Sequence, residues 1–173
     1  MKVIWITGLS GSGKSTLARE VVNSLREKGN TVILLDGDEL REVFGAVNQN
    51  DKNHTYDGRL ALSKQYSNLC KLIASQGVIV VIATISLFHD IHEWNRKNLT
   101  DYFEVYLKVP IEELRKRDPK GIYKSFDEGK LNNVAGIDLK VDEPKNPDWL
   151  IEFNFDQPVV KLAEELLIRI NLI

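Results

Sequence analysis

The chain has 173 residues, 43% of them hydrophobic and 28% charged, with a formal net charge of −2, which suits one globular domain. This balance argues against a protein that binds nucleic acid by neutralising phosphates, and no apolar run approaches the roughly 18 residues of a membrane span. We therefore expect neither nucleic acid nor a membrane as a partner, and a cytoplasmic location, because the sequence enters a strand without a signal peptide.

Apolar runs of strand length alternate with segments of helical periodicity, which predicts an α/β fold with a doubly wound parallel sheet and helices on both faces. Residues 1–173 form a single domain in this interpretation. Strands are expected over residues 2–7, 31–35, 78–86, 102–109 and 150–155, and helices over about 14–28, 59–76, 89–99, 110–117 and 158–170. Segments 44–58 and 118–148 are polar and without strong periodicity, and we interpret them as lid or acceptor-binding loops. The single cysteine, Cys70, falls in a helical pattern and is expected to be an inert core thiol.

The segment that organises the chain is Gly8-Leu9-Ser10-Gly11-Ser12-Gly13-Lys14-Ser15, which stands between a predicted strand and a predicted helix. This is the context of a phosphate-binding P-loop, whose backbone N–H groups and helix N-terminus surround an anion. Lys14 is expected to bridge the β- and γ-phosphates of ATP and act in catalysis, and the Ser15 hydroxyl to ligate Mg²⁺. An ordinary glycine-rich turn is the alternative. The expected nucleotide contacts are Gly8, Ser10, Gly11, Ser12, Gly13, Lys14, Ser15 and Thr16.

Two carboxylates follow the second predicted strand, in the sequence Asp36-Gly37-Asp38. A carboxylate near a P-loop either holds Mg²⁺ through water or accepts a proton from an attacking hydroxyl. We assign Asp36, which ends the strand, to the metal, and Asp38 to the acceptor hydroxyl as general base. The alternative for Asp38 is an N-cap of the helix over residues 39–43. Arg41 lies one turn into that helix and either binds an anionic acceptor or is simply solvated.

Cations cluster in Arg115-Lys116-Arg117-Asp118-Pro119-Lys120-Gly121, before the second loop segment. Lys116 is expected on a solvated helix face, whereas Arg117 and Lys120 border the loop and are candidates for a lid that closes on phosphates. Asp118-Pro119-Lys120-Gly121 also matches D-x-x-G, which raises the alternative of a nucleotide-regulated switch or binding module. This string follows a helical pattern rather than a strand, and no N-K-x-D guanine-reading motif occurs. A single P-loop kinase domain over residues 1–173 is therefore favoured.

These motifs resemble those of the adenylylsulfate (APS) kinases, P-loop enzymes that transfer the γ-phosphate of ATP to the 3′-hydroxyl of adenosine 5′-phosphosulfate. The resemblance runs through most of the chain. It rests on Gly8–Thr16, Leu35–Arg41, Ile85-Ser86, the specific string Arg117-Asp118-Pro119-Lys120-Gly121-Ile122-Tyr123, Gly136-Ile137-Asp138 and Glu143-Pro144-Lys145-Asn146-Pro147. It implies that Ser86 belongs to the acceptor site, together with Asp38, Arg41 and Lys120.

The departures from that family concern the acceptor. The family places the acceptor adenine between two phenylalanines and contacts it with an Arg and an Asn. Here the Arg is kept as Arg59, while His54 and Val134 stand at the two phenylalanine positions and Leu62 at the Asn position. His89 and His92 replace two further arginines. We interpret Leu62, Val134, His89 and His92 as one cluster of changes on the acceptor side, where His54, Tyr56 or Phe88 could replace the lost aromatic stacking.

The resemblance therefore implies Mg²⁺-ATP as donor and a small anion linked to a nucleoside 5′-phosphate as acceptor. A related branch of the family phosphorylates cytidine diphosphoramidate in capsule phosphoramidate synthesis, and we favour that acceptor because its base is smaller. The alternative is a true adenylylsulfate kinase whose pocket is built from different residues. A homodimer is the candidate assembly.

Overall fold

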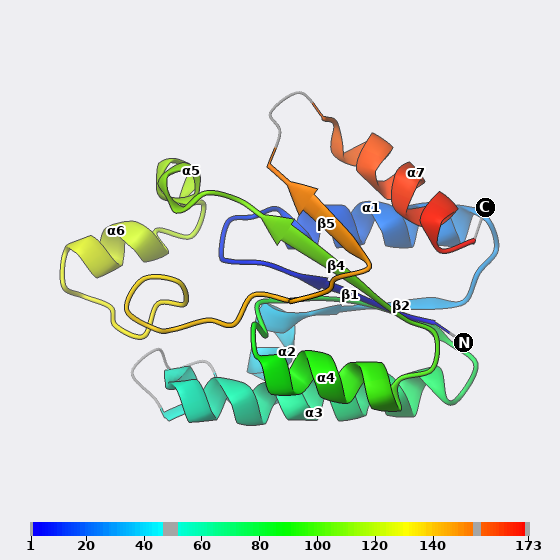
Figure 1. Cartoon of the computed structure of the whole chain (residues 1–173), viewed down its shortest axis with the longest axis horizontal. Helices are drawn as coiled ribbons and strands as arrows, with labels where there is room; N and C mark the ends of the chain where they lie inside the picture. Colours follow the sequence, from blue (N-terminus) through cyan, green and yellow to red (C-terminus); the bar gives the residue numbers. More distant parts are fainter. Residues whose placement is uncertain (1, 47–51, 154–156, 172–173) are drawn as a thin grey trace.

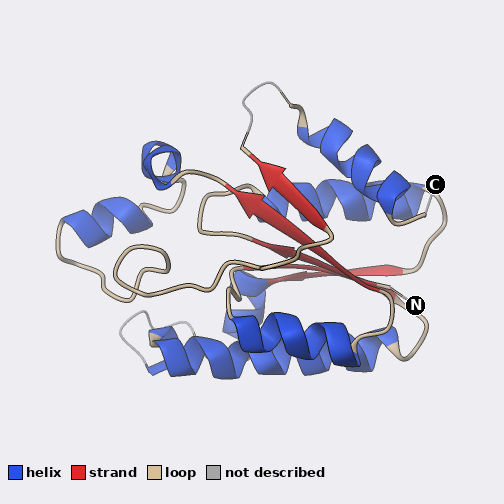
Figure 2. Ribbon diagram, in the orientation of Figure 1, coloured by secondary structure: helices blue, strands red, loops and turns tan. Residues whose placement is uncertain are grey.

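The computed structural model describes residues 2–46, 52–153 and 157–171, and it contains one five-stranded parallel sheet with helices on both faces (Figures 1 and 2). The strands are β1 Val3–Thr7, β2 Val32–Asp36, β3 Ile79–Thr84, β4 Tyr102–Lys108 and β5 Trp149–Glu152. The helices are α1 Lys14–Glu27, α2 Gly37–Val43, α3 Tyr56–Ala74, α4 His89–Asn98, α5 Ile111–Arg117, α6 Ile122–Asp127 and α7 Val159–Arg169, with a short 3₁₀ turn at Lys52–His54. The predicted α/β fold is confirmed.

The strand order is β2-β3-β1-β4-β5, so β1 lies at the centre of the sheet. All five of its residues are buried, as a strand covered on both faces requires. The chain leaves β1 towards α1, and its two neighbours β3 and β4 come from later in the sequence. The order reverses at this strand, and ligands of open parallel sheets bind outside the carboxyl ends of the strands at such a point.

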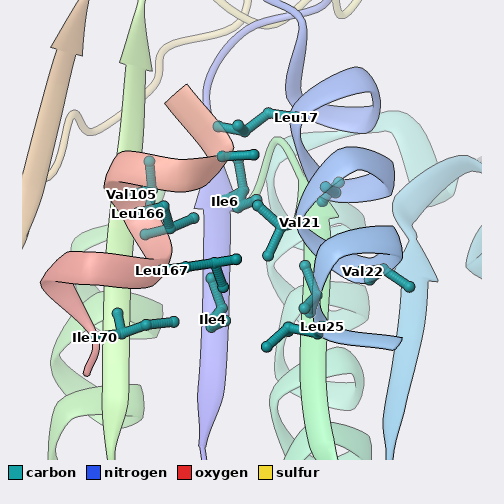
Figure 3. Close-up of a cluster of buried hydrophobic side chains, with 14 of the residues drawn as sticks. Ile4, Ile6, Leu17, Val21, Val22, Leu25, Val105, Leu166, Leu167 and Ile170 are labelled. Carbon is teal, nitrogen blue, oxygen red and sulfur yellow. The ribbon is translucent and has the colours of Figure 1, made fainter. Parts of the chain in front are cut away.

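Each face of the sheet has its own hydrophobic core. Alternate β1 side chains, Ile4 and Ile6, pack with α1 and α7 on one face, where Leu17, Val21 and Leu166 are fully buried (Figure 3). The other alternate pair, Val3 and Trp5, packs against α3 and α4. A third, smaller cluster centres on Leu114, Tyr123 and Val134 and joins α5 and α6 to the loop that follows them. The first two cores fix the position of the sheet edge. The third holds part of the predicted lid segment 118–148 beside that edge.

Some predicted boundaries were wrong. The segment 118–148 is not all loop, because it contains α6, whose first turn is capped by Asp118. Helix α3 begins three residues earlier than predicted, since the Thr55 hydroxyl accepts the Gly58 N–H at 3.2 Å and caps the first turn. Strand β3 ends at Thr84, two residues before Ser86. Residues 47–51 of the first predicted loop and 154–155 of the last predicted strand lie outside the described residues.

Candidate active site

A cavity of about 860 Å³ opens at the carboxyl edge of the sheet. Its wall combines side chains from the P-loop, from α2 and α3, from the segment after β3 and from the lid. It brings together most of the predicted site residues, namely Ser10, Gly11, Gly13, Lys14, Ser15, Thr16, Asp36, Asp38, Arg41, His54, Arg59, Ser86, Phe88, Arg117 and Lys120. Gly8 and Ser12 do not line it, and Ser12 lines a second, smaller cavity instead.

The P-loop conformation depends on its glycines. Gly8 has φ +151°, and a Cβ there would come within 2.6 Å of the Leu107 carbonyl oxygen, so no larger residue fits beside β4. Gly13 has φ +95° and directly precedes α1, in the left-handed region that glycine tolerates. The loop therefore turns tightly into the N-terminus of a 14-residue helix, where backbone N–H groups without intrahelical partners favour an anion.

Lys14 projects back across this loop, and its Nζ donates to the Leu9 carbonyl at 2.7 Å and lies 3.5 Å from the Ser12 hydroxyl. Burial and the charge of Lys120 lower the pKa of Lys14 to about 8, against an opposing effect of Asp38 and Asp36. A phosphate in the loop would supply the counter-charge that this ammonium lacks. The geometry suits a phosphate-binding lysine whose cationic form is stabilised by its ligand.

Asp36 links the P-loop to α2. One of its oxygens, Oδ2, accepts the Ser15 hydroxyl at 2.6 Å, and the other, Oδ1, accepts the Asp38 N–H at 2.9 Å. Asp36 is therefore the N-cap of α2, and the alternative role of Asp38 as that cap was wrong. The cap falls on Asp36 because it is the last extended residue before the helix, which begins at Gly37.

Ser15 and Asp36 provide adjacent hydroxyl and carboxylate oxygens, the donors that Mg²⁺ prefers. Within residues 2–46, 52–153 and 157–171 no group of three or more His, Cys, Asp or Glu side chains is arranged to hold a metal. A magnesium ion bound mainly by phosphate oxygens and water needs only one or two protein ligands, so these two residues fit such an ion.

Asp38 takes part in a different contact. Its carboxylate forms an ion pair with Lys120, although the two residues are 82 positions apart in the chain. Both side chains are about half exposed. The contact joins α2 to the start of the predicted lid segment 118–148, and both side chains line the cavity.

The lid begins with Asp118, whose two carboxylate oxygens accept the N–H groups of Tyr123 and Lys124 at 3.2 and 2.9 Å. The Tyr123 hydroxyl donates to the Ser10 carbonyl at 2.9 Å and so attaches α6 to the P-loop. The aspartate of the D-x-x-G string is therefore a helix cap of the lid, lying after α5 rather than at a strand end. This position removes the structural basis for the switch alternative.

Arg117 lies between two cavities. It lines the main one and also a second of about 250 Å³ beside α1 and the end of β5. Its guanidinium carbon is 4.4 Å from the centre of the Phe153 ring, and its Nε donates to Glu113 at 3.1 Å. At this distance the two groups stack directly on each other, so the pair offers a flat surface, not a slot, to a planar ligand in the second cavity.

On the other side of the main cavity, two arginines, Arg59 on α3 and Arg41 on α2, contact the backbone of the 3₁₀ turn. Arg59 donates to the backbone carbonyls of His54 and Asn133 at 2.9 and 2.8 Å, which joins α3 to the loop after α6. Arg41 reaches the Asn53 carbonyl at 3.5 Å. Burial, together with the charge of Arg41, lowers the pKa of Arg59 to about 10. Two guanidiniums that disfavour each other's charge form a region suited to an anion.

Ser86 and Phe88 line the cavity just beyond β3. Ser86 has φ +27°, unusual for a residue with a side chain, and its hydroxyl lies 2.8 Å from that of Ser63 and 2.9 Å from that of Thr84. Phe88 is buried, with its ring edge-on to Tyr56 at a centroid distance of 5.0 Å. Both residues are thus held in fixed positions in the wall.

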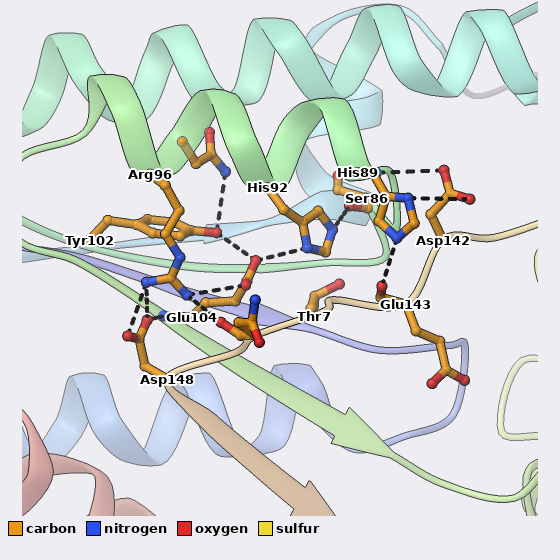
Figure 4. A network of polar contacts seen from close by, with 12 residues as sticks. Thr7, Ser86, His89, His92, Arg96, Tyr102, Glu104, Asp142, Glu143 and Asp148 are labelled. Carbon is orange, nitrogen blue, oxygen red and sulfur yellow. Dashed lines mark hydrogen bonds and ion pairs between the residues drawn. The ribbon is translucent and has the colours of Figure 1, made fainter.

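Three of the four residues interpreted as an acceptor-side cluster do not line the cavity. Leu62 is buried in the core between α3 and the sheet. His92 is buried with its Nδ1 2.9 Å from Glu104, and His89 lies beside Asp142 and 3.1 Å from the Glu143 carbonyl (Figure 4). Only Val134 of this set lines the cavity, so the inferred cluster was wrong: matching positions along a helix does not determine which way each side chain points.

Sequence reasoning also missed several cavity residues. Ser63 and Tyr66 follow Arg59 at spacings of four and seven, which places all three on one face of α3. That spacing was the available signal. Asn133 could not have been found, because its carbonyl meets Arg59 through a long-range contact that no local pattern encodes.

Comparisons with known proteins agree with this geometry. The family model described as adenylylsulphate kinase matches residues 1–152. Over the full length of the fold, the structure superimposes on the APS kinase of Mycobacterium tuberculosis in complex with AMPPNP and APS, with a TM-score of 0.88, 33% identity, and 98% and 97% of the two chains covered.

Curated relatives carry two different names at similar identity. The cytidine diphosphoramidate kinase of Campylobacter jejuni is 38% identical over 145 residues, covering 83% of this chain and 81% of the relative. The adenylyl-sulfate kinase of Clostridium kluyveri is 39% identical over 173 residues, covering 98% and 85%. No helix in the described part of the chain is long and apolar enough to span a membrane.

Proposed function

The chain belongs to the adenylylsulfate kinase family, whose members are ATP-dependent kinases that phosphorylate a hydroxyl group, and within it we propose that this chain acts on the 3′-hydroxyl of cytidine diphosphoramidate. The choice of acceptor rests on which side chains line the cavity at two positions. His54 and Val134, at the positions where the family resemblance predicts two phenyl rings, both line the cavity. A pyrimidine needs less stacking surface than adenine, so it loses less when those rings are absent.

Donor binding is assigned to the P-loop. The backbone N–H groups of residues 8–15 and the N-terminus of α1 surround the phosphates, and Lys14 adds a charge whose effect grows as the γ-phosphoryl group leaves. The base is assigned to the second cavity, which is lined by the stacked pair of Arg117 and Phe153. Ser15 and Asp36 are the residues that would hold Mg²⁺, which when bound neutralises charge on the β- and γ-phosphates.

The acceptor is placed on the far side of Asp38. Its carboxylate accepts the proton of the attacking 3′-hydroxyl, and this requires the ion pair with Lys120 to open or to shift towards the phosphates. Arg41 and Arg59 face the anionic end of the acceptor, and Ser86 helps to position it. The lid closes over both substrates and excludes water, which would otherwise compete with the acceptor hydroxyl.

The second candidate acceptor is adenosine 5′-phosphosulfate. The observation that favours it is Phe88, a buried ring in the cavity wall that is braced by Tyr56 and could stack on adenine in place of the missing phenylalanines. Relatives named adenylyl-sulfate kinase are as similar to this chain as the cytidine diphosphoramidate kinase.

The two acceptors can be distinguished by their kcat/KM at fixed, saturating Mg²⁺-ATP. We expect cytidine diphosphoramidate to be preferred by at least tenfold, about 1.4 kcal/mol of transition-state discrimination. Val134→Phe is the matched variant, because it restores one ring at the cavity wall, and it is expected to shift the ratio towards adenosine 5′-phosphosulfate. A wild-type enzyme that prefers adenosine 5′-phosphosulfate would overturn the assignment and make the chain an adenylylsulfate kinase.

A further inference from the structure

Tyr66 carries a hydroxyl group that the fold leaves without a hydrogen-bond partner among the described residues. The residue is 2% exposed, and it lines the main cavity. Burying a hydroxyl without a partner is unfavourable, so such a group is uncommon in a native protein and calls for an explanation. Phenylalanine would fill the same space in the core between α3 and the sheet without that cost.

The position of Tyr66 on α3 gives the hydroxyl its surroundings. Arg59, Ser63 and Tyr66 follow one another at helical spacing on the face that borders the cavity. Ser63 already uses its hydroxyl, which donates to the Arg59 carbonyl at 2.8 Å and lies 2.8 Å from Ser86 Oγ. Arg59 is committed to two backbone carbonyls. Tyr66 is thus the member of this row whose polar group has no hydrogen-bond partner among the described residues.

The charges around Tyr66 indicate which ligand group would meet it. Arg41, Asp38 and Arg59 are the charged side chains that act on the Tyr66 hydroxyl. Among the described residues, Arg41 and Arg59 form hydrogen bonds with backbone carbonyls, and Arg59 also lies 3.5 Å from the His54 ring nitrogen. No carboxylate accepts from either guanidinium there, so their positive charge is available to a ligand. Burial raises the pKa of Tyr66, which keeps the hydroxyl protonated and able to donate.

From these contacts we infer that Tyr66 is a specificity residue of the acceptor site, whose hydroxyl donates a hydrogen bond to an anionic oxygen of the acceptor between Arg41 and Arg59. The inference rests on the proposed function, since it assumes that the cavity takes a nucleotide-linked anion. It adds to that function a residue that neither the P-loop nor the lid motif includes. A phosphoryl oxygen suits the position because it accepts from a hydroxyl and from guanidiniums at once.

The test compares Tyr66→Phe with a matched control on the same helix. Ser67 is also buried, with a hydroxyl that has no partner in the part of the chain that the structure describes, but it does not line the cavity. Ser67→Ala therefore removes a similar group away from the ligand. Each variant is assayed with cytidine diphosphoramidate and with adenosine 5′-phosphosulfate at saturating Mg²⁺-ATP. Thermal stabilisation by cytidine 5′-diphosphate, measured with saturating Mg²⁺-AMPPNP, adds a readout that does not depend on turnover.

We expect Tyr66→Phe to lower kcat/KM for the preferred acceptor about 10- to 100-fold, mainly through KM, as for the loss of a hydrogen bond to a charged group. The KM for ATP should stay within about twofold, the midpoint of thermal unfolding without ligand should not fall, and the stabilisation by cytidine 5′-diphosphate should shrink. Ser67→Ala should leave all these quantities within about twofold or unchanged.

A Tyr66→Phe enzyme with wild-type kcat/KM and wild-type stabilisation by cytidine 5′-diphosphate would overturn the role of Tyr66 and leave the proposed function standing. Equal losses in Tyr66→Phe and Ser67→Ala would also overturn it, because they would show a general effect of the α3 core. A wild-type protein that neither phosphorylates nor binds any of these nucleotides would instead refute the proposed function, and the inference about Tyr66 with it.

Discussion

The lowered pKa of Lys14 leads to a prediction about how ATP use depends on pH. The free enzyme must hold Lys14 as a cation to attract phosphates, and its pKa is about 8 rather than the ordinary 10.5. From pH 7 to pH 9.5 the protonated fraction of such a group falls about 30-fold, whereas a lysine with the ordinary pKa loses only about a tenth. We therefore expect kcat/KM for ATP to decline tenfold per pH unit above about pH 8.

The assay is an initial-rate measurement of kcat/KM for ATP between pH 6.5 and 9.5, at saturating acceptor and Mg²⁺ and constant ionic strength. At saturating ATP the decline in kcat should begin at higher pH, because bound phosphate raises the pKa of Lys14. Lys14→Arg is the control: it is expected to be less active, but with no decline above pH 8, because guanidinium stays charged. A wild-type profile that stays flat to pH 9.5 would refute the reasoning.

Stability should respond to the same group with the opposite sign. The pKa of Lys14 is lower in the folded state than in the unfolded state, so the charged form of Lys14 destabilises the ligand-free fold. This destabilisation is fully present below about pH 8 and disappears as the pH rises from about 8 towards 10.5. Lys14→Met should therefore raise the free energy of unfolding of the ligand-free protein at pH 7, and the difference from wild type should vanish near pH 10.5. Chemical denaturation across this range measures both effects.

Three further predictions concern the rest of the site. Asp38→Asn should lower kcat about 100-fold with little change in the KM for ATP, as expected for a lost general base. Steady-state kinetics measure both quantities, and an unchanged kcat would show that Asp38 only pairs with Lys120. Asp36→Ala should instead cost about 1 kcal/mol of stability through the lost cap of α2 and raise the Mg²⁺ concentration needed for half-maximal activity. Tyr123→Phe should weaken the attachment of the lid to Ser10 and raise the KM for ATP a few-fold. If the variant and the wild type have equal KM values for ATP, the attachment does not contribute to ATP binding.

The fold and the phosphate side of the site were predictable because their signals are local. A continuous apolar run marks a doubly covered strand, and the glycine spacing before Lys14 specifies a turn into a helix. Asp36, at the end of β2, reaches Ser15 as a consequence of parallel strands meeting at one edge. Each of these features depends on residues near one another in sequence or on the strand order alone.

The acceptor side was less predictable because it depends on side-chain direction. Leu62 lies three residues after Arg59 on the same helix, yet it packs into the core while Arg59 borders the cavity. His92 faces the inner network of Glu104 rather than the ligand. In the same way, α6 was missed because Asp118 caps it from outside the helix, a role that its D-x-x-G context concealed.

The network around Glu104 connects stability to the site, since His92 contacts it through one ring nitrogen and lies 3.1 Å from the Ser86 carbonyl through the other (Figure 4). Burial alone would raise the pKa of Glu104, but hydrogen bonds from His92 and Tyr102 and the charge of Arg96 lower it overall. The folded carboxylate is thus stabilised above its unfolded pKa of about 4.5, and this contribution is lost as the pH falls below that value.

Replacing His92 by leucine tests whether this buried pair supports Ser86. Removing one partner of a buried ion pair costs about 3–5 kcal/mol, and we expect about 2 here because Tyr102 and Arg96 still reach Glu104 at 2.8 and 3.4 Å. Urea unfolding at pH 7 measures this loss, and the acid unfolding midpoint should move to higher pH. The acceptor kcat/KM should fall as well, because the backbone at Ser86, with φ +27°, loses a contact that holds it. The control is Arg96→Leu, at the more exposed end of the network, which should lower stability less than His92→Leu and leave kcat/KM for the acceptor unchanged. If His92→Leu and Arg96→Leu lower kcat/KM equally, His92 has no specific link to Ser86.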